Sequence, residues 1–421
     1  MPQRRAAADE RLHEDRFRHV HRALKESVAP LIVRSLQEQV ADLAAPEVPL
    51  LTRRGWIPPQ PLSLDHIRLL YTPPRKDTFA AARRQLAPYW PRIAGSPVPT
   101  YSAAVQRFDG AAHFFDADSF RLLGLEPPAA GCEDRTTTLR FTRGSYFDWY
   151  DTGEALGYEA ARCYAESGGA TVVGRYRRWL NSPFDFVRRC ATPGINTLTV
   201  RTSRDRTVRS TFYLHRRTDV ATARGTVHVV PAGEFQPSGG HVGDRATGGE
   251  DFDIRATVIR EYAEELLGAA DLADPTSKES PVDFMARHAA VESALRGGGA
   301  RLHYLGTGLY PLTWKPEILL VCVFEDRLFD QTFADMKREV DEGAIEGPGG
   351  RPLTEDDRLP GRDRLPGAVS LLLGRKKRPY QGLPFDEATV HSYAEAPTTL
   401  PAARACLKLA WKHREFLDIP A

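Results

Sequence analysis

The sequence predicts an α/β protein, and three features of the chain support this class. Residues 195–232 carry short runs in which polar and apolar side chains alternate, as they do along β-strands. Residues 252–267 instead repeat apolar side chains every four positions, which is the spacing of one helix face. Residues 303–326 return to strand-like runs, so a helix lies between strands, as in α/β folds.

The chain divides by its texture into three parts. At 421 residues it is longer than one hydrophobic core usually organises, so we expect more than one domain. A mixed composition gives way to regular strand alternation after Gly194. We therefore predict an N-terminal domain at 1–195, a central domain at 196–370 and a C-terminal helical extension at 371–421.

The N-terminal domain is expected to be a mostly helical α+β domain. Near the start of the chain, apolar side chains recur every three or four residues, at Phe17, Val20, Leu24, Val28 and Leu31. Residues 45–65 then form a proline-rich connector, which cannot continue a helix. Residues 66–195 mix helical and strand-like runs and contain no catalytic pattern, so the sequence assigns no role to this domain.

Charge and cysteine content exclude several classes of protein. There are 57 basic and 55 acidic side chains, so the formal net charge of +2 gives no field for gripping nucleic acid or an anionic membrane. The five cysteines are scattered, as expected of thiols in a reducing compartment. No apolar run approaches the roughly 20 residues that span a bilayer. We therefore expect a cytoplasmic protein without a membrane or nucleic-acid partner.

The central and C-terminal parts give specific expectations for secondary structure. Strands are expected at 195–202, 210–217 and 226–231, and a fully buried strand at 318–324. Gly268 is suited to end the helix that begins near residue 252. A last helix at 400–417 should pack back on the central domain. Its buried stripe is expected to consist of Leu407, Ala410, Trp411 and Phe416.

The residues that indicate chemistry lie in the segment REYAEELLG, at 260–268. On a helix, residues three and four apart share a face, so Glu261, Glu264 and Glu265 form one carboxylate cluster. Such a cluster is stable when a cation neutralises it, and oxygen-only ligands suit Mg²⁺ or Mn²⁺. Arg260 lies four residues before Glu264 and can orient its carboxylate. The alternative is a solvated helix face held by salt bridges.

This segment, in its context of strands, resembles the signature of the Nudix hydrolase superfamily, G-x5-E-x7-R-E-U-x-E-E-x-G-U, where U is aliphatic. Arg260, Glu261, Glu264 and Glu265 match the R-E-x-x-E-E core, and the segment 231–233 stands near the usual Pro-Gly-Gly. The box is degenerate, because Phe252 occupies the position of the first glutamate and Gly268 falls one place late. The resemblance covers residues 200–345.

The resemblance implies a fold, a cofactor and a reaction. The fold would be an α/β/α sandwich around a mixed sheet. Mg²⁺, or Mn²⁺, would be bound by Glu261, Glu264 and Glu265, and Gly233 and Glu234 would contact the substrate. The reaction would be Mg²⁺-dependent hydrolysis of a nucleoside diphosphate linked to another moiety.

A further carboxylate would be needed as the general base in such a reaction. The resemblance places this residue on a loop beyond the later strand, where Glu325 and Glu342 are the candidates. Glu317 is a third candidate, although we expect it to begin a strand.

Two functions therefore stay open on the sequence. The intact R-E-x-x-E-E core favours an enzyme, a Nudix-type pyrophosphohydrolase. The missing first glutamate and the large N-terminal part favour a regulatory protein that senses a nucleotide without cleaving it. A homodimer is compatible with either function.

Three further features have both a structural and a functional interpretation. His215 and His228 lie in predicted strands, where structural histidines are commoner than ligands. The basic residues 375–378 form either a solvated turn or a grip on phosphate, and four charges are few for a nucleic-acid footprint.

Overall fold

The structure is a computed structural model of the 421-residue chain. It describes residues 2–24, 48–74, 79–93, 96–109, 114–128, 135–203, 205, 208–217, 225–238, 249, 251–270, 281–340, 343–359 and 378–420. The predicted apolar positions Val28 and Leu31, Glu342 and the basic residues 375–377 lie outside these ranges.

The described elements are mixed in type, which confirms the predicted α/β class. The helices are α1 (Pro2–Ala23), α3 (Ala80–Leu86), α4 (Tyr101–Phe108), α5 (Tyr146–Trp149), the π-helical segment η5 (Tyr150–Glu154), α6 (Ala155–Glu166), α7 (Arg175–Leu180), α8 (Ile254–Glu265), α9 (Pro281–Arg296), α10 (Asp326–Thr332), α12 (Glu387–Glu395) and α13 (Pro401–Lys412). The strands are β1 (Leu62–Ser63), β2 (Ile67–Tyr71), β3 (Arg92–Ile93), β4 (Ser96–Pro97), β5 (Asp118–Glu126), β6 (Thr137–Ser145), β7 (Gly194–Thr202), β8 (Thr211–Phe212), β9 (Leu214–Arg217), β10 (Val227–Val229), β11 (Ala232–Glu234), β12 (Ala300–Leu309), β13 (Pro316–Glu325), β14 (Glu339–Val340), β15 (Gly343–Ile345) and β16 (Leu383–Pro384).

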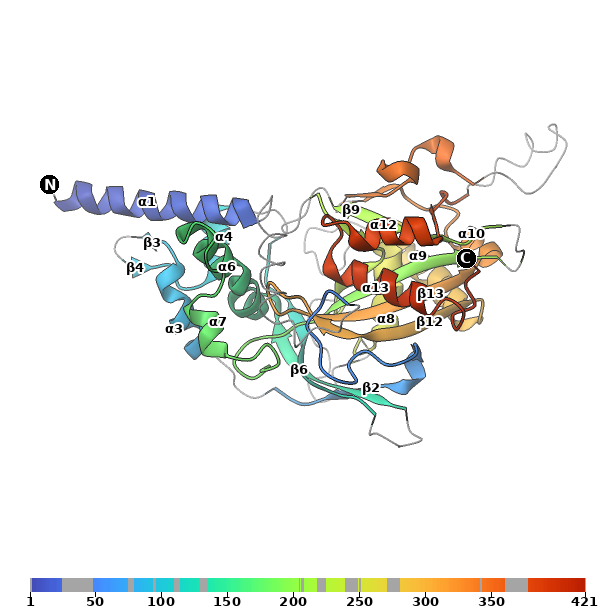
Figure 1. Cartoon of the computed structure of the whole chain (residues 1–421), viewed down its shortest axis with the longest axis horizontal. Coiled ribbons are helices and arrows are strands. Elements are labelled where there is room, and N and C mark those ends of the chain that lie inside the picture. The colour runs from blue at the N-terminus through green and yellow to red at the C-terminus, as the bar shows by residue number, and fades with distance from the viewer. Residues whose placement is uncertain are drawn as a thin grey trace.

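A mixed sheet of seven strands forms the centre of the molecule (Figure 1). Its strand order is β1-β12-β13-β7-β8-β16, and β11 pairs with β7 beside β8. β13 and β7 run parallel, and the other pairs in the sheet are antiparallel. A smaller sheet of four strands has the order β10-β9-β15-β14.

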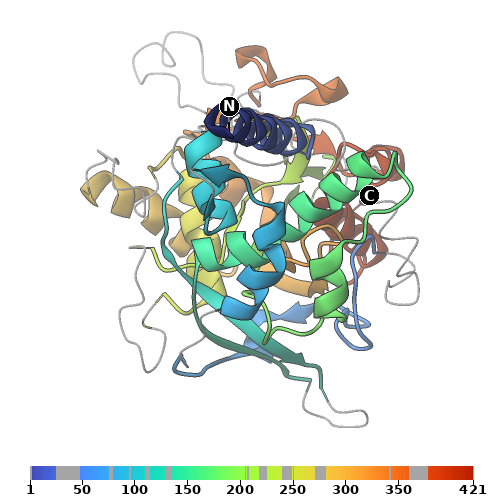
Figure 2. The same cartoon turned by 90° about the vertical axis from the view of Figure 1, so that its left-hand side faces the viewer.

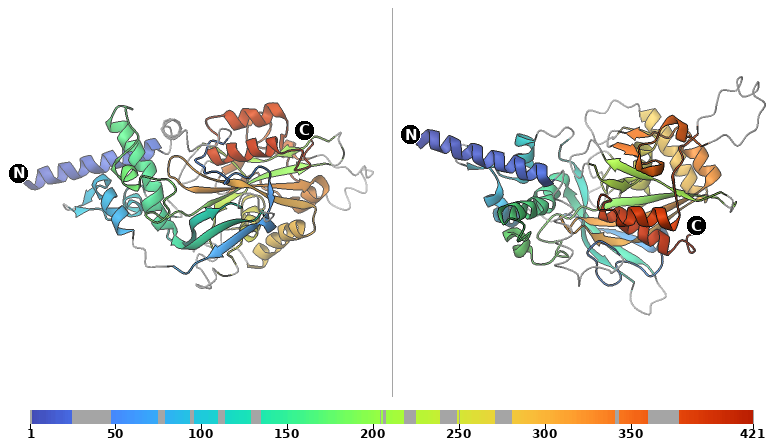
Figure 3. Two further views of the ribbon diagram at one scale, coloured as in Figure 1. Left: turned by 60° about the horizontal axis from the view of Figure 1, so that its bottom comes forward. Right: turned by 45° about the horizontal axis from the view of Figure 1, so that its top comes forward.

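Helices cover both faces of the central sheet, and the composition of β13 explains why. One face of this strand bears Ile318, Leu320, Cys322 and Phe324, and the other bears Leu319, Val321 and Val323. Side chains alternate along a strand, so a continuous apolar run needs cover on both sides. α8 and α9 pack on the first face, and α12 and α13 on the second (Figure 3).

The N-terminal part places its helices at one end of the molecule (Figure 1). Figure 2 looks onto this end, where α1 lies beside the shorter helices. Phe17, Val20 and Leu24 are buried here, as their spacing predicts. A sheet of three strands, in the order β2-β6-β5, continues from this end beneath the central sheet.

The N-terminal part shares its core with the central sheet. β1 extends the sheet by pairing with β12, and the N–H of Phe120 in β5 donates to the carbonyl of Phe235 at 3.1 Å. One hydrophobic cluster includes Phe17 and Phe141 together with Tyr262 of α8. The predicted domain boundary at 195/196 falls inside β7, and the boundary stays a prediction.

Several predicted elements are confirmed, and two details of the prediction are wrong. The strands at 195–202 and 318–324 and the helix near 252–267 correspond to β7, β13 and α8. The run 210–217 is not one strand, because it divides at Tyr213 into β8 and β9 of two different sheets. α13 packs on the central sheet, but it ends at Lys412, and Phe416 beyond it is 48% exposed rather than buried.

Candidate functional site

α8 carries the R-E-x-x-E-E segment, and local sequence signals fix both of its ends. The side chain of Asp253 accepts hydrogen bonds from the N–H groups of Arg255 and Ala256, which caps the first turn. Gly268 follows the last turn with a φ of +70°, and its N–H donates to the carbonyl of Glu264 at 3.1 Å. The predicted role of Gly268 at the helix end is thereby confirmed.

The three predicted carboxylates of α8 are enclosed with Arg260. Arg260, Glu261 and Glu265 are each about 4–6% exposed, which excludes the alternative of a solvated helix face. The guanidinium of Arg260 lies 2.8 Å from Oε1 of Glu261 and 3.5 Å from Oε2 of Glu264. The predicted pairing of Arg260 with Glu264 is present, and Arg260 supplies one positive charge inside the carboxylate cluster.

The carboxylate cluster lies against the backbone of β11. The N–H of Ala232 donates to both carboxylate oxygens of Glu265, at 3.3 Å each. A guanidinium nitrogen of Arg260 donates to the carbonyl of Glu234 at 3.3 Å. A Cβ at Gly233 would lie 2.0 Å from the carboxyl carbon of Glu261, so only glycine permits this close approach.

Two observations on the carboxylate cluster do not favour the predicted metal site. Within the described ranges, no three His, Cys, Asp or Glu side chains are arranged so that they could hold one metal ion. Arg260 already neutralises part of the carboxylate charge that would attract a cation. The assignment of Glu261, Glu264 and Glu265 as ligands of Mg²⁺ or Mn²⁺ stays a prediction.

Of the two candidate bases that the structure describes, Glu317 lies nearer to this region than Glu325 does. β11 pairs with the first residues of β7, and Gly194 of β7 lies level with Glu317 of β13. Glu317 is the second residue of β13, as predicted. Glu325 lies eight residues farther along the same strand, about 26 Å away at the usual rise per residue. Glu342 lies outside the described residues.

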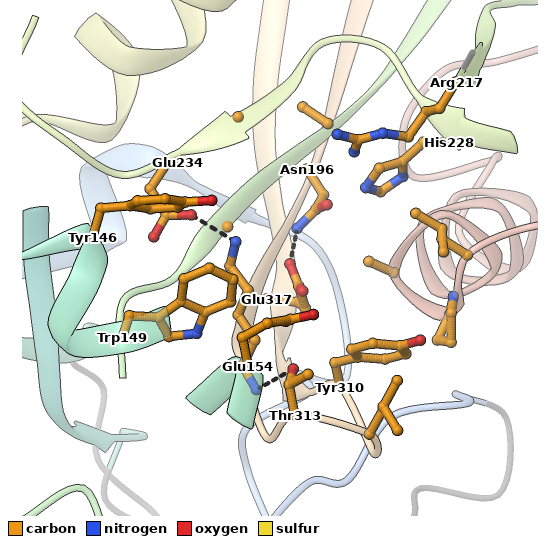
Figure 4. A pocket seen from close by; sticks show the side chains of 18 of the residues that line it. Tyr146, Trp149, Glu154, Asn196, Arg217, His228, Glu234, Tyr310, Thr313 and Glu317 are labelled. Atoms are coloured by element: carbon orange, nitrogen blue, oxygen red, sulfur yellow. Dashed lines mark hydrogen bonds and ion pairs between the residues drawn. The ribbon is translucent and has the colours of Figure 1, made fainter. Parts of the chain in front are cut away.

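A cavity of about 300 Å³ opens on the other side of β11 (Figure 4). Alternation along β11 explains the arrangement: Gly233 faces α8, whereas Ala232 and Glu234 point toward the cavity. The remaining walls come from distant parts of the chain. They include His21 of α1 and Leu24 just after it, Trp149 of α5, the hairpin between β12 and β13, and the first residues of α13.

Lys315 and Glu234 form an ion pair at one side of the cavity. The ammonium of Lys315 lies 2.6 Å from Oε2 of Glu234 and 4.6 Å from the centre of the Trp149 ring. Burial alone lowers the pKa of Lys315, but nearby carboxylates outweigh burial, so its pKa is raised and the group is charged. Oε1 of Glu234 is buried and accepts no hydrogen bond from the described residues. Oε1 of Glu234 is therefore an acceptor to which a ligand can donate a hydrogen bond.

Glu317 lies in the middle of the cavity wall. Burial raises its pKa to about 7, against the opposing effects of Lys315 and of the hydrogen bond from Asn196. Nδ2 of Asn196 donates to Oε2 of Glu317 at 2.8 Å. A Cβ at Gly194 would lie 2.5 Å from the same oxygen, so glycine makes room for the carboxylate.

His228 and Arg217 form the opposite side of the cavity (Figure 4). Burial lowers the pKa of His228 well below its usual value, and the charges of Arg217 and Lys315 act in the same direction. The ring is therefore neutral. Nδ1 accepts a hydrogen bond from the N–H of Val229 at 2.9 Å, which places the ring proton on Nε2. Thus His228, expected to be structural, presents a donor at the cavity.

Phe252, which the predicted resemblance aligns with the first glutamate of the Nudix signature, belongs to an aromatic cluster. Its ring lies 5.0 Å from that of Phe120, 5.5 Å from Phe141, 5.4 Å from Tyr71 and 5.9 Å from Phe235, measured between centroids. These rings come from β2, β5, β6 and the end of β11. The position therefore joins α8 to the N-terminal strands instead of contributing a carboxylate.

The sequence predicted the α8 side of β11 but not the cavity. Gly233 and Glu234 line the cavity, and Gly233 also contacts Glu261. Trp149, Arg217 and Lys315 were not expected, because each lies in a different segment without a local motif. Among the polar cavity residues, the sequence singled out Glu317 as a candidate base, Glu234 as a substrate contact and His228 as structural rather than a ligand.

Comparison with known proteins adds no assignment. No protein-family model matches the chain, and no curated protein matches it. In the part of the chain that the structure describes, no helix has the length and apolar character needed to cross a membrane.

Proposed function

We propose that the protein is a regulatory protein that binds a nucleotide-type small molecule in the cavity beside β11, using a Nudix-type domain as the binding module. The cavity carries this proposal, because its walls come from both the N-terminal part and the central sheet. Its volume of about 300 Å³ is at the lower end of the range of ligand pockets and suits a single nucleotide.

The side chains of the cavity match the chemistry of a nucleotide. Trp149, Tyr146 and Tyr310 offer aromatic surface for a base, Arg217 offers charge for phosphate, and Lys315 holds the carboxylate of Glu234 in place. Glu234 offers a buried acceptor to the donors of a base or sugar. A ligand that contacts both the N-terminal part and the central sheet would favour one arrangement of the two, as regulation requires.

Two features place binding ahead of hydrolysis. Phe252 packs among aromatic rings at the position of the first Nudix glutamate. Arg260 is enclosed among the remaining carboxylates and offsets part of their charge. Both features are compatible with a Nudix-type fold that retains the helix as a structural support for β11.

The proposal is tested by titrating a panel of nucleotides into wild type and Lys315→Gln by calorimetry. Glutamine carries no charge and can hold Glu234 only by a neutral hydrogen bond, so the acceptor on Glu234 loses its fixed position. We therefore expect affinity for the bound nucleotide to fall at least about tenfold. Lys408→Gln is the matched control, since Lys408 forms an ion pair of the same length, 2.6 Å, with Glu395 on the surface. The proposal fails if no nucleotide binds, or if Lys315→Gln binds as wild type does.

Hydrolysis is the second candidate, favoured by the position of Glu261 and Glu265 against the strand that lines the cavity. The same panel, incubated with Mg²⁺ and read for phosphorylated products, decides between the two. An enzyme would release product and would lose at least about a hundredfold in turnover on Glu265→Gln. Glu292→Gln, on the surface of α9, is the control. Binding without product supports the regulatory function.

A further inference from the structure

The side of the cavity formed by Arg217 and His228 has the properties of an anion site. Both residues project from the same face of the paired strands β9 and β10, because His228 pairs with His215 and Arg217 lies two residues beyond. His228 is 7% exposed, and within the described ranges its Nε2 has no hydrogen-bond partner. A neutral ring with its proton on Nε2 is a hydrogen-bond donor, and an oxygen atom of the ligand would be its acceptor.

The first turn of α13 lies beside this pair. Leu400, Pro401 and Ala402 line the cavity, and the N–H of Leu400 donates to the carbonyl of Val227, next to His228, at 2.9 Å. α13 has 12 residues, and no side chain in the described part of the chain caps its N-terminus. Pro401 has no N–H and that of Leu400 is donated to Val227, so an anion would meet the N–H groups of Ala402 and Ala403. The helix terminus also carries a partial positive charge, which favours an anion.

The opposite side of the cavity has different chemistry. Figure 4 shows Tyr146, Trp149 and Glu234 on one side, Arg217 and His228 on the other, and Asn196 and Glu317 between them. The first side offers aromatic rings and the buried acceptor Oε1 of Glu234, whose carboxylate lies beside Lys315. The second side carries the guanidinium of Arg217 and the partial positive charge of the α13 terminus, so this side favours an anion.

We propose that Arg217, Nε2 of His228 and the first turn of α13 bind the phosphoryl group of the ligand, whose aromatic ring lies toward Trp149 and Glu234. The ligand class is an aromatic phosphomonoester with hydrogen-bond donors on its ring, of the size of a nucleoside monophosphate. This inference rests on the proposed function and adds to it the orientation of the ligand and the position of its charge.

The test compares AMP, GMP, CMP and UMP with their nucleosides by calorimetry, on the full chain. Wild type should bind at least one nucleotide about tenfold or more tightly than its nucleoside. Arg217→Gln should abolish that preference while leaving nucleoside affinity within about twofold, because only the phosphoryl contact is lost. Arg209→Gln is the control, since Arg209 is exposed and does not line the cavity.

Inorganic phosphate separates failure of the subsite from failure of the proposed function. Its ³¹P resonance should broaden with wild type and Arg209→Gln but not with Arg217→Gln, and His228→Phe should weaken the effect. The inference is overturned if a nucleotide binds and Arg217→Gln weakens nucleotide and nucleoside equally, or neither. If no nucleotide binds while phosphate still requires Arg217, the subsite stands and the nucleotide function fails.

Discussion

Glu317 differs from an ordinary surface carboxylate in its pKa, because its environment is buried. It lies on a cavity wall between the cation Lys315 and the amide of Asn196, yet burial raises its pKa from 4.5 to about 7. The folded protein therefore retains a proton, between about pH 4.5 and pH 7, that the unfolded chain has released. The free energy of unfolding must decrease as pH rises through this window.

Glu317→Gln should remove this pH dependence, since glutamine is uncharged at every pH and can still accept from Asn196. Above about pH 7 the variant should be more stable than wild type by up to about 3 kcal/mol, less where solvent in the cavity screens the charge. Below about pH 4.5 the two proteins should be equally stable. Urea unfolding at pH 4.5, 6 and 8 measures this, and a constant difference across pH would contradict the assignment.

At the scale of residues, helical spacing allowed the sequence to predict the α8 cluster but not the cavity beside β11. Glu261, Glu264 and Glu265 are neighbours because a helix brings positions three and four apart together. Lys315 and Trp149 meet only through tertiary packing, 166 residues apart in the chain. Each is unremarkable in its local segment, so no local pattern indicates that they share a cavity.

At the scale of elements, the contact between β11 and α8 depends on the absence of a side chain at Gly233. Gly233→Ala would place a methyl group 2.0 Å from the carboxyl carbon of Glu261, so the buried Glu261 carboxylate, the strand or the helix must move. We expect destabilisation of about 1–3 kcal/mol, the range for overpacking a buried site. Any bound nucleotide should also bind more weakly, because Gly233 lines the cavity.

Gly124→Ala is the control for Gly233→Ala, since a Cβ at Gly124 in β5 meets no atom within 4 Å among the described residues. Its stability should stay within about 0.5 kcal/mol of wild type. Denaturant unfolding and nucleotide titration of both variants measure the difference. If Gly233→Ala unfolds like the control, the close contact between β11 and α8 is not present in solution.

The errors in predicted elements have physical causes that the local pattern does not contain. Residues 210–217 alternate as one strand would, but Tyr213 is fully buried, with its hydroxyl donating to the carbonyl of Tyr380 at 2.9 Å. That distant contact divides the run between two sheets. Phe416 continues the helical spacing of α13, yet the helix ends at Lys412 and the ring reaches only the edge of His303.

At the scale of the whole molecule, the aromatic cluster around Phe252 joins the N-terminal part to the central sheet. Phe120 and Phe141 of the three-stranded sheet meet Phe235, just after β11, and Phe252, just before α8. The sequence predicted separate domains from length and from the change of texture near Gly194. The local pattern of residues indicates strands, but it does not indicate which apolar faces pack together across the predicted boundary.

The shared core predicts how the whole chain unfolds. Because one hydrophobic cluster extends from Phe17 to Phe324, we expect one cooperative thermal transition for the full chain instead of two. Phe252→Leu should lower the midpoint of that single transition, at a cost of about 1–3 kcal/mol, because the ring contacts both parts. Scanning calorimetry with intrinsic fluorescence and far-UV circular dichroism gives the test.

Two resolved transitions, only one of which Phe252→Leu shifts, would support the independent domains predicted at 1–195 and 196–370. Coincident transitions that shift together would show that the cavity lies within one cooperative unit, through which a bound ligand can act on both parts.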